Sequence, residues 1–106
     1  MSPLIRAACI AMLVGAATIL PAKSSTAADA ATAVLAGSCA NCHGTDGRSP
    51  GPIPPIAGMP FAVLKAQLDS FRAGETQGAT VMTRIAKGFT EAELQTLARH
   101  FADMKK

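Results

Sequence analysis

The five residues Cys39-Ala40-Asn41-Cys42-His43 decide how the rest of this 106-residue chain is interpreted. They form the pattern C-x-x-C-H, which is the attachment signature of a c-type haem. Each thiol can add across one vinyl group of the porphyrin, and two intervening residues set the sulfur atoms about one helical turn apart, which matches neighbouring vinyl groups. His43 follows directly and can present its imidazole to the iron. The pattern predicts one covalently attached haem held by Cys39, Cys42 and His43.

Three other uses of the two cysteines stay open at this point. In an oxidising compartment, Cys39 and Cys42 could form a structural disulfide. A thioredoxin-like redox pair would need a βαβ context, which the sequence does not show. A zinc site built from Cys39, Cys42 and His100 would lack a fourth ligand at ordinary spacing. Attachment of a haem is favoured over all three.

The segment before the motif has the layout of a secretory signal peptide. Arg6 precedes an uninterrupted apolar run over residues 7–20, and a polar stretch rich in small residues follows. The small residues near Ala28 predict cleavage after that position. Residues 1–28 are therefore expected to be a leader, and 29–106 to be the functional domain. The expected location is the periplasm, because haem attachment of this kind takes place outside the cytoplasm.

Two alternatives for this leader, an uncleaved membrane anchor and a lipoprotein signal, fit less well. The apolar run has 14 residues, whereas a membrane-spanning helix needs about 20. Cys9 precedes most of the apolar run instead of ending it, which does not suit a lipoprotein. No stable insertion into a membrane is expected after cleavage.

Removal of the leader changes the composition that bears on function. The full chain has a formal net charge of +3, and the leader contains Arg6 and Lys23 but no acidic residue, so the remaining 78 residues carry about +1. This near-neutral charge gives no argument for nucleic-acid binding. The chain has no Trp, no Tyr and only four Phe, so its core would be thin. Small domains of this kind commonly need an internal prop, which a haem would supply.

The sequence after the leader predicts an all-α fold, because no stretch alternates as a strand does. Gly44–Pro60 contains five Pro and four Gly and is expected to be a loop. The expected helices lie over residues 29–38, over residues 61–73 between Pro60 and Gly74, and after a capping box at Thr90–Glu93, with one or two further helical turns at residues 79–87.

The first and last of these helices each show a narrow apolar face. On the first helix this face is formed by Ala31, Val34 and Leu35. We expect its Ala31 and Leu35 to meet Leu97 and Phe101 of the last helix, which would close the two ends of the domain against each other.

From residue 30 to residue 104, the chain resembles class I cytochromes c. The resemblance rests on C-A-N-C-H-G at residues 39–44, on a methionine after a short helix, and on Pro54-Pro55-Ile56-Ala57-Gly58, which is similar to the family's P-x-L-x-G segment with Ile in place of Leu. It implies a small fold in which the N- and C-terminal helices pack together around one covalently bound haem. It also implies that the Pro54 carbonyl accepts a hydrogen bond from the His43 imidazole, fixing its tautomer.

Met82 is expected to be the second axial ligand of the iron. It lies ahead of the last helix and past His43, at the place of the ligand methionine in the family it resembles. Met59 and Met104 are interpreted as packing residues, and His100 as a packed or solvated side chain. With both axial positions filled, we expect single-electron transfer and no catalysis, so the chain is expected not to be an enzyme and to have no catalytic residues.

Within that family, residues 49–58 and 80–89 look like the cytochrome subunit of flavocytochrome c sulfide dehydrogenase, although related dihaem cytochromes carry similar segments. This resemblance implies a sulfide-oxidising flavoprotein as electron donor and a soluble cytochrome as acceptor. The alternative is a free electron carrier between a dehydrogenase and a terminal oxidase. A catalytic haem protein, such as a peroxidase, would require that Met82 not be a ligand or be displaced.

Overall fold

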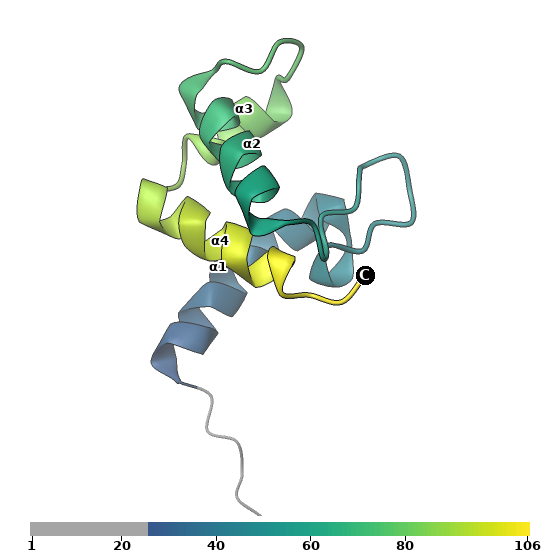
Figure 1. The fold of residues 1–106 in the computed structure, drawn as a ribbon, viewed down its shortest axis with the longest axis vertical. Coiled ribbons are helices and arrows are strands. Elements are labelled where there is room, and N and C mark those ends of the chain that lie inside the picture. Colours follow the sequence, from purple (N-terminus) through teal and green to yellow (C-terminus); the bar gives the residue numbers. More distant parts are fainter. Residues whose placement is uncertain (1–25) are drawn as a thin grey trace, which may run out of the picture.

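The computed structural model describes residues 26–106, so most of the expected leader lies outside the described residues. Within this range the chain consists of four α-helices and one short 3-10 turn, with no strand, and the all-α expectation is confirmed. In chain order the elements are α1 (Ala27–His43), the 3-10 turn η1 (Thr45–Gly47), α2 (Phe61–Ala73), α3 (Val81–Ala86) and α4 (Glu91–Ala102) (Figure 1).

Helix α1 begins with a capping box that the sequence analysis did not expect. The backbone N–H of Asp29 donates to the Thr26 hydroxyl at 3.2 Å, and the backbone N–H of Thr26 donates to the Asp29 carboxylate at 3.1 Å. The Thr26 hydroxyl also donates to the Asp29 carboxylate at 2.8 Å. This bond, together with the one from the Thr26 N–H, lowers the pKa of the Asp29 carboxyl because both stabilise its charged form. The expected cleavage position after Ala28 therefore falls within the first turn of a capped helix.

At its other end α1 runs farther than expected. It does not stop at Ser38 but continues to His43 and ends where Gly44 adopts a φ of 82°. A side chain at Gly44 would collide with the backbone of Ser49 at 2.9 Å, so glycine is needed where the chain turns back. The whole C-x-x-C-H motif consequently lies on the last turns of one helix, which holds its side chains in a fixed relation.

Helices α2 and α4 begin where the start signals in the sequence predict, and α2 also ends where expected. Helix α2 follows Pro60 and ends at Gly74, which has the left-handed conformation with a φ of 76°. Helix α4 starts with the expected capping box, in which the Thr90 hydroxyl accepts from the Glu93 N–H at 3.2 Å and the Glu93 carboxylate accepts from the Thr90 N–H at 2.7 Å.

The core lies where α4 crosses α1 and packs against α2, and α3 lies at the far end of α2 (Figure 1). Leu35 of α1 contacts this core as expected, but Val34 is 78% exposed and Ala31 is exposed, so the expected inner face of α1 is wrong at both positions. Ala36 is buried instead. The buried core residues are Ala36, Leu64, Leu94, Leu97, Ala98 and Phe101.

A helix that crosses a lipid bilayer needs about 20 predominantly apolar residues. Between residues 26 and 106, no helix has both the length and the apolar character that crossing a membrane requires.

Candidate haem site

One cavity brings together all five residues that the sequence singled out. Cys39, Cys42, His43, Pro54 and Met82 line it, and its volume is about 570 Å³. That volume falls within the range of about 300–1,000 Å³ that is usual for cofactor sites.

All four helices contribute side chains to the wall of this cavity. The last turns of α1 provide the motif, the proline-rich loop provides residues 53–56, and the rest of the wall comes from one side of α2, α3 and α4. No Asp, Glu, Lys or Arg lines the cavity. The side chains from these three helices are Leu64, Gln67, Leu68, Phe71, Val81, Met82, Ile85, Leu97, Ala98 and Phe101. The site is therefore apolar, with its few polar groups concentrated at the motif.

His43 makes the one hydrogen bond that defines its chemistry. Its Nδ1 atom lies 2.7 Å from the carbonyl oxygen of Pro54. A carbonyl oxygen can only accept, so Nδ1 must carry the proton and donate it. The lone pair of Nε2 is then free to bind a metal, and the hydrogen bond restrains the orientation of the ring.

The two thiols differ in their surroundings. Cys39 is half-buried, and this burial raises the pKa of its thiol, although a hydrogen bond from Ser38 acts in the opposite direction. Cys42 is exposed, and the two cysteines are not joined in a disulfide. Both sulfur atoms remain available at the cavity wall.

The other interpretations of the cysteines find no support in the described part of the chain. Among residues 26–106, no three His, Cys, Asp or Glu side chains gather closely enough to hold a metal ion. His100 does not line the cavity but packs edge-on against Phe101, with ring centroids 5.1 Å apart. The same range contains no strand and so no βαβ unit for a thioredoxin-like pair.

Two of the methionines line the cavity. Met82, the second residue of α3, does so, and Met59, just before α2, does as well, whereas Met104 does not. Met59 also packs against the buried core, which gives it a structural role of its own. The geometry thus reduces the candidates for a methionine ligand to these two.

Gly47 is a further residue of the site that sequence reasoning did not single out. Its carbonyl accepts hydrogen bonds from the N–H groups of Ile56 and Ala57, at 2.8 and 3.1 Å. These bonds close the loop just after Pro54. Gly47 has a φ of 75°, and a Cβ there would lie 2.7 Å from Ile56 and 2.9 Å from Phe101. Only its place in a Gly/Pro-rich loop could have drawn attention to it.

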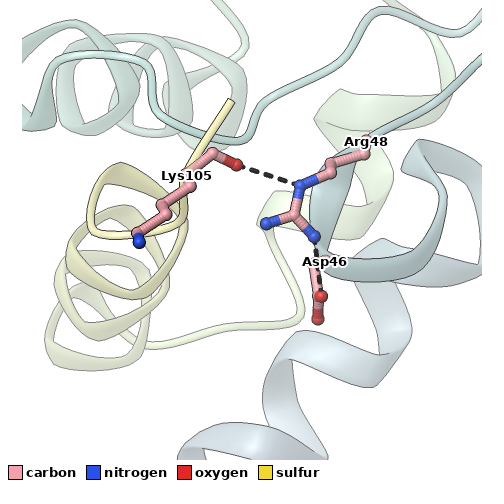
Figure 2. A network of polar contacts seen from close by, with 3 residues as sticks. All are labelled: Asp46, Arg48 and Lys105. Atoms are coloured by element: carbon pink, nitrogen blue, oxygen red, sulfur yellow. Dashed lines mark hydrogen bonds and ion pairs between the residues drawn. The ribbon is translucent and has the colours of Figure 1, made fainter.

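The same loop is also joined to the end of the chain. Figure 2 shows Arg48 between Asp46 and Lys105. The Arg48 Nε donates to the Lys105 carbonyl at 2.9 Å, and its Nη1 contacts the Asp46 carboxylate at 2.8 Å. Arg48 and Lys105 are 57 positions apart, so no local pattern in the sequence could reveal this contact.

Taken as a set of donors, these residues fit a haem c. Two thiols and an imidazole lie on adjacent helical turns at the edge of an apolar cavity, and thioether side chains line its wall. The Nδ1–H of His43 is held by a backbone carbonyl, as is usual for metal-binding histidines.

Comparisons with known proteins point in the same direction. The family model for cytochrome c matches residues 27–105. The cytochrome subunit of sulfide dehydrogenase from Chlorobaculum tepidum is 41% identical over 73 residues, covering 69% of this chain and 66% of the relative. Cytochrome c-554(548) from Halomonas halodenitrificans is 31% identical over 72 residues, covering 65% of this chain and 87% of the relative. Cytochrome c-552 from Acidithiobacillus ferridurans is 36% identical over 66 residues, but the match spans 28% of that protein.

Proposed function

The chain belongs to the cytochrome c family, and we propose that it transfers single electrons through a haem c ligated by His43 and Met82. The cofactor of this family is covalently attached haem c. When bound, the haem supplies an iron that alternates between the ferrous and ferric states and so holds one electron at a time. The observation that carries the proposal is the cavity in which the C-x-x-C-H motif and Met82 meet.

The motif residues divide the work of holding the cofactor. The Cys39 and Cys42 sulfur atoms form the two thioether bonds, and both line the cavity from the last turns of α1. His43 binds the iron through Nε2, because its Nδ1–H is engaged by the Pro54 carbonyl. This hydrogen bond fixes the ring and raises its basicity, which strengthens it as a ligand.

Met82 completes the coordination in this proposal. It lines the cavity from α3 without being part of the buried core cluster, whereas Met59 packs against that cluster. A thioether ligand raises the reduction potential relative to a second histidine. The uncharged wall acts in the same direction, because a low-dielectric environment disfavours the extra positive charge of ferric iron. With His43 and Met82 as its two protein ligands, the haem would hold one electron at a time, and no position on the iron would be left for a substrate.

The partner we propose is a sulfide-oxidising flavoprotein. The support is the 41% identity to the Chlorobaculum tepidum subunit. The chain spans 66% of that relative, so the assignment of the whole protein's partner is part of the proposal. A free electron carrier is the second candidate, and it is favoured by the match that covers 87% of cytochrome c-554(548).

We also propose that the protein is exported and acts in the periplasm after removal of residues 1–28. The layout of Arg6, the apolar run and the small residues that follow supports this. N-terminal sequencing of the purified holoprotein is expected to begin at Asp29. A holoprotein that still begins at Met1 would contradict processing.

Electron transfer and partner can be tested in one set of measurements. The purified protein is expected to keep its haem stain on a denaturing gel. A redox titration of the haem should show a single couple that transfers one electron. Addition of sulfide together with the proposed flavoprotein partner should reduce the haem, and the two proteins should co-purify. Reduction without a stable complex would favour the free carrier. A protein with no covalent haem would overturn the proposal.

A further inference from the structure

The segment that presents the Pro54 carbonyl to His43 makes few hydrogen bonds of its own. Four of the seven residues in 49–55 are proline and lack an N–H. Its hydrogen bonds are the one from His43 and one between the Gly51 N–H and the Ser49 hydroxyl, at 3.3 Å. The position of the Pro54 carbonyl therefore depends on what holds the two ends of this segment.

The two ends are joined to each other by the bonds from the Ile56 and Ala57 N–H groups to the Gly47 carbonyl, and both are also attached to the C-terminal segment, residues 101–106. After the proline-rich stretch, the N–H of Gly58 donates to the Phe101 carbonyl at 2.8 Å. Before it, the Nε of Arg48 donates to the Lys105 carbonyl at 2.9 Å (Figure 2). The first attachment is made between backbone atoms and persists with almost any side chain. The second depends on one side chain, that of Arg48.

The stability that the ion pair with Asp46 contributes does not by itself explain why Arg48 lies against the Lys105 carbonyl. The two side chains are 44% and 49% exposed, and ion pairs with such exposure contribute little to stability. What the pair does is hold the guanidinium, so that Nε points at the Lys105 carbonyl. A planar guanidinium can make both contacts at once, whereas an ammonium on a flexible stem presents a single point of charge.

We propose that Arg48 is a positioning residue for His43: by bonding to the Lys105 carbonyl, it keeps the Pro54 carbonyl within hydrogen-bonding distance of the ring. This inference rests on the proposed function, in which His43 binds the iron. A hydrogen bond from Nδ1 makes the imidazole more basic, and a more basic ligand favours ferric over ferrous iron because the ferric ion carries more charge. Weakening the bond should raise the reduction potential.

The sign of the change in reduction potential distinguishes a positioning role of Arg48 from a purely electrostatic effect of its charge. If Arg48 acted only through its charge, its removal would favour ferric iron and lower the potential. The dependence on salt distinguishes the two roles a second time. At 1 M ionic strength the Debye length is about 3 Å, so the Coulombic effect of an exposed charge on the potential would largely disappear. A change in the hydrogen bond of His43 would persist.

The test compares the wild-type holoprotein with Arg48→Met, using Arg72→Met as the matched control. Arg72 is an exposed arginine on the last turn of α2 and makes no side-chain hydrogen bond among the described residues. Reduction potentials are measured at low and high salt. Arg48→Met is expected to favour the ferrous state at least threefold, which is about 28 mV at 59 mV per decade. The reduction potential of Arg72→Met is expected to differ from that of the wild type by less than about 28 mV.

A second readout reports on the hydrogen bond itself. In the ferrous protein, the Nδ1 proton of His43 can be followed by NMR, and its exchange with water is expected to become severalfold faster in Arg48→Met but not in Arg72→Met. If Arg48→Met gives too little holoprotein, Arg48→Lys keeps the charge and one donor, and should shift both readouts in the same direction by less.

The outcomes keep the two proposals apart. An unchanged or lower potential in Arg48→Met, with unchanged exchange of the His43 proton, would overturn the positioning role while the wild type still carries a His43-ligated haem. A wild type that lacks such a haem would overturn the proposed function instead.

Discussion

Gly47 and Phe101 lie so close together that a side chain at Gly47 would collide with the phenyl ring. A Cβ would come within 2.9 Å of the ring and 2.7 Å of Ile56. The contact joins the start of the proline-rich loop to the last helix, directly beside the residues that close the loop after Pro54. The shape of the site thus depends on a missing side chain as much as on those present.

Replacing Gly47 by alanine should therefore destabilise the protein more than the same change at a glycine with free space. Gly78 has a φ of 77°, close to the 75° of Gly47, but nothing lies within 4 Å of its Cβ position. Gly78→Ala is expected to cost about 1–2 kcal/mol from backbone strain alone. Gly47→Ala adds a steric clash and should cost about 2–5 kcal/mol. Urea denaturation of the two holoproteins measures the difference, and equal costs would contradict the close contact.

The second prediction concerns the axial methionine. Met82→Ala should abolish the sulfur-to-iron charge-transfer band of the oxidised protein. It should also lower the reduction potential by more than about 59 mV, a factor of ten in favour of the ferric state. The controls are Met59→Leu, at the other methionine of the cavity, and Met104→Leu, outside it. Both should keep the band. A band that survives Met82→Ala but is lost in Met59→Leu would assign the ligand to Met59.

The third prediction concerns attachment of the cofactor. The double variant Cys39→Ser/Cys42→Ser should lose all haem staining on a denaturing gel, because no thioether bond can form. Cys9→Ser serves as the control, since this cysteine lies in the expected leader and outside the motif. It should stain like the wild type. Residual staining of the double variant at the mass of the protein would argue against attachment through the motif.

The fourth prediction concerns the core behind the cavity. Leu94 is fully buried and does not line the cavity, so Leu94→Ala should lower the free energy of unfolding by about 2–5 kcal/mol with little effect on the potential. Val34 is 78% exposed, and Val34→Ala should stay within about 0.5 kcal/mol. Chemical denaturation and potentiometry of both variants provide the check. A large cost at Val34 would show that its side chain is covered in the native protein.

Much of the fold could be predicted because its signals are local. Pro60 and Gly74 mark the ends of α2, and the capping box at Thr90 marks the start of α4; both helices begin as expected. Helix α1 runs past its expected end at Ser38 and through the motif, because nothing in residues 39–43 ends a helix before Gly44.

The orientation of α1 could not be predicted from its sequence. Alanines and other small residues lie around the whole helix, and its polar side chains do not gather on one face, so the sequence does not show which side is turned to solvent. The sequence pattern groups Val34 with Ala31 and Leu35 on one apolar face. In the structure the inner positions are those of Leu35, Ala36 and Cys39, and Val34 lies outside them. The choice depends on how α4 crosses α1, which is a property of the assembled fold.

The residues of the candidate site also fall into those that the sequence predicts and those that it does not. The cysteines and His43 follow from one short motif, and Met82 and Pro54 were expected from a family resemblance; all five line one cavity. Gly47 and the contact between Arg48 and Lys105 escaped because their partners are distant along the chain. Such contacts arise only when the loop and the C-terminus have been brought together.

The attachment of the proline-rich loop to residues 101–106 also bears on the order in which the protein can fold. Helix α1, with His43 at its end, is held by local hydrogen bonds, but the carbonyl groups of Phe101 and Lys105 that hold the loop lie 58 and 62 positions after His43. The chain can form α1 from local contacts, yet the partner of the His43 ring is fixed only after the loop and residues 101–106 have come together. Long-range closure of this kind is slow compared with helix formation. Closure of the site is thus expected to be a late step of folding that follows the formation of α1.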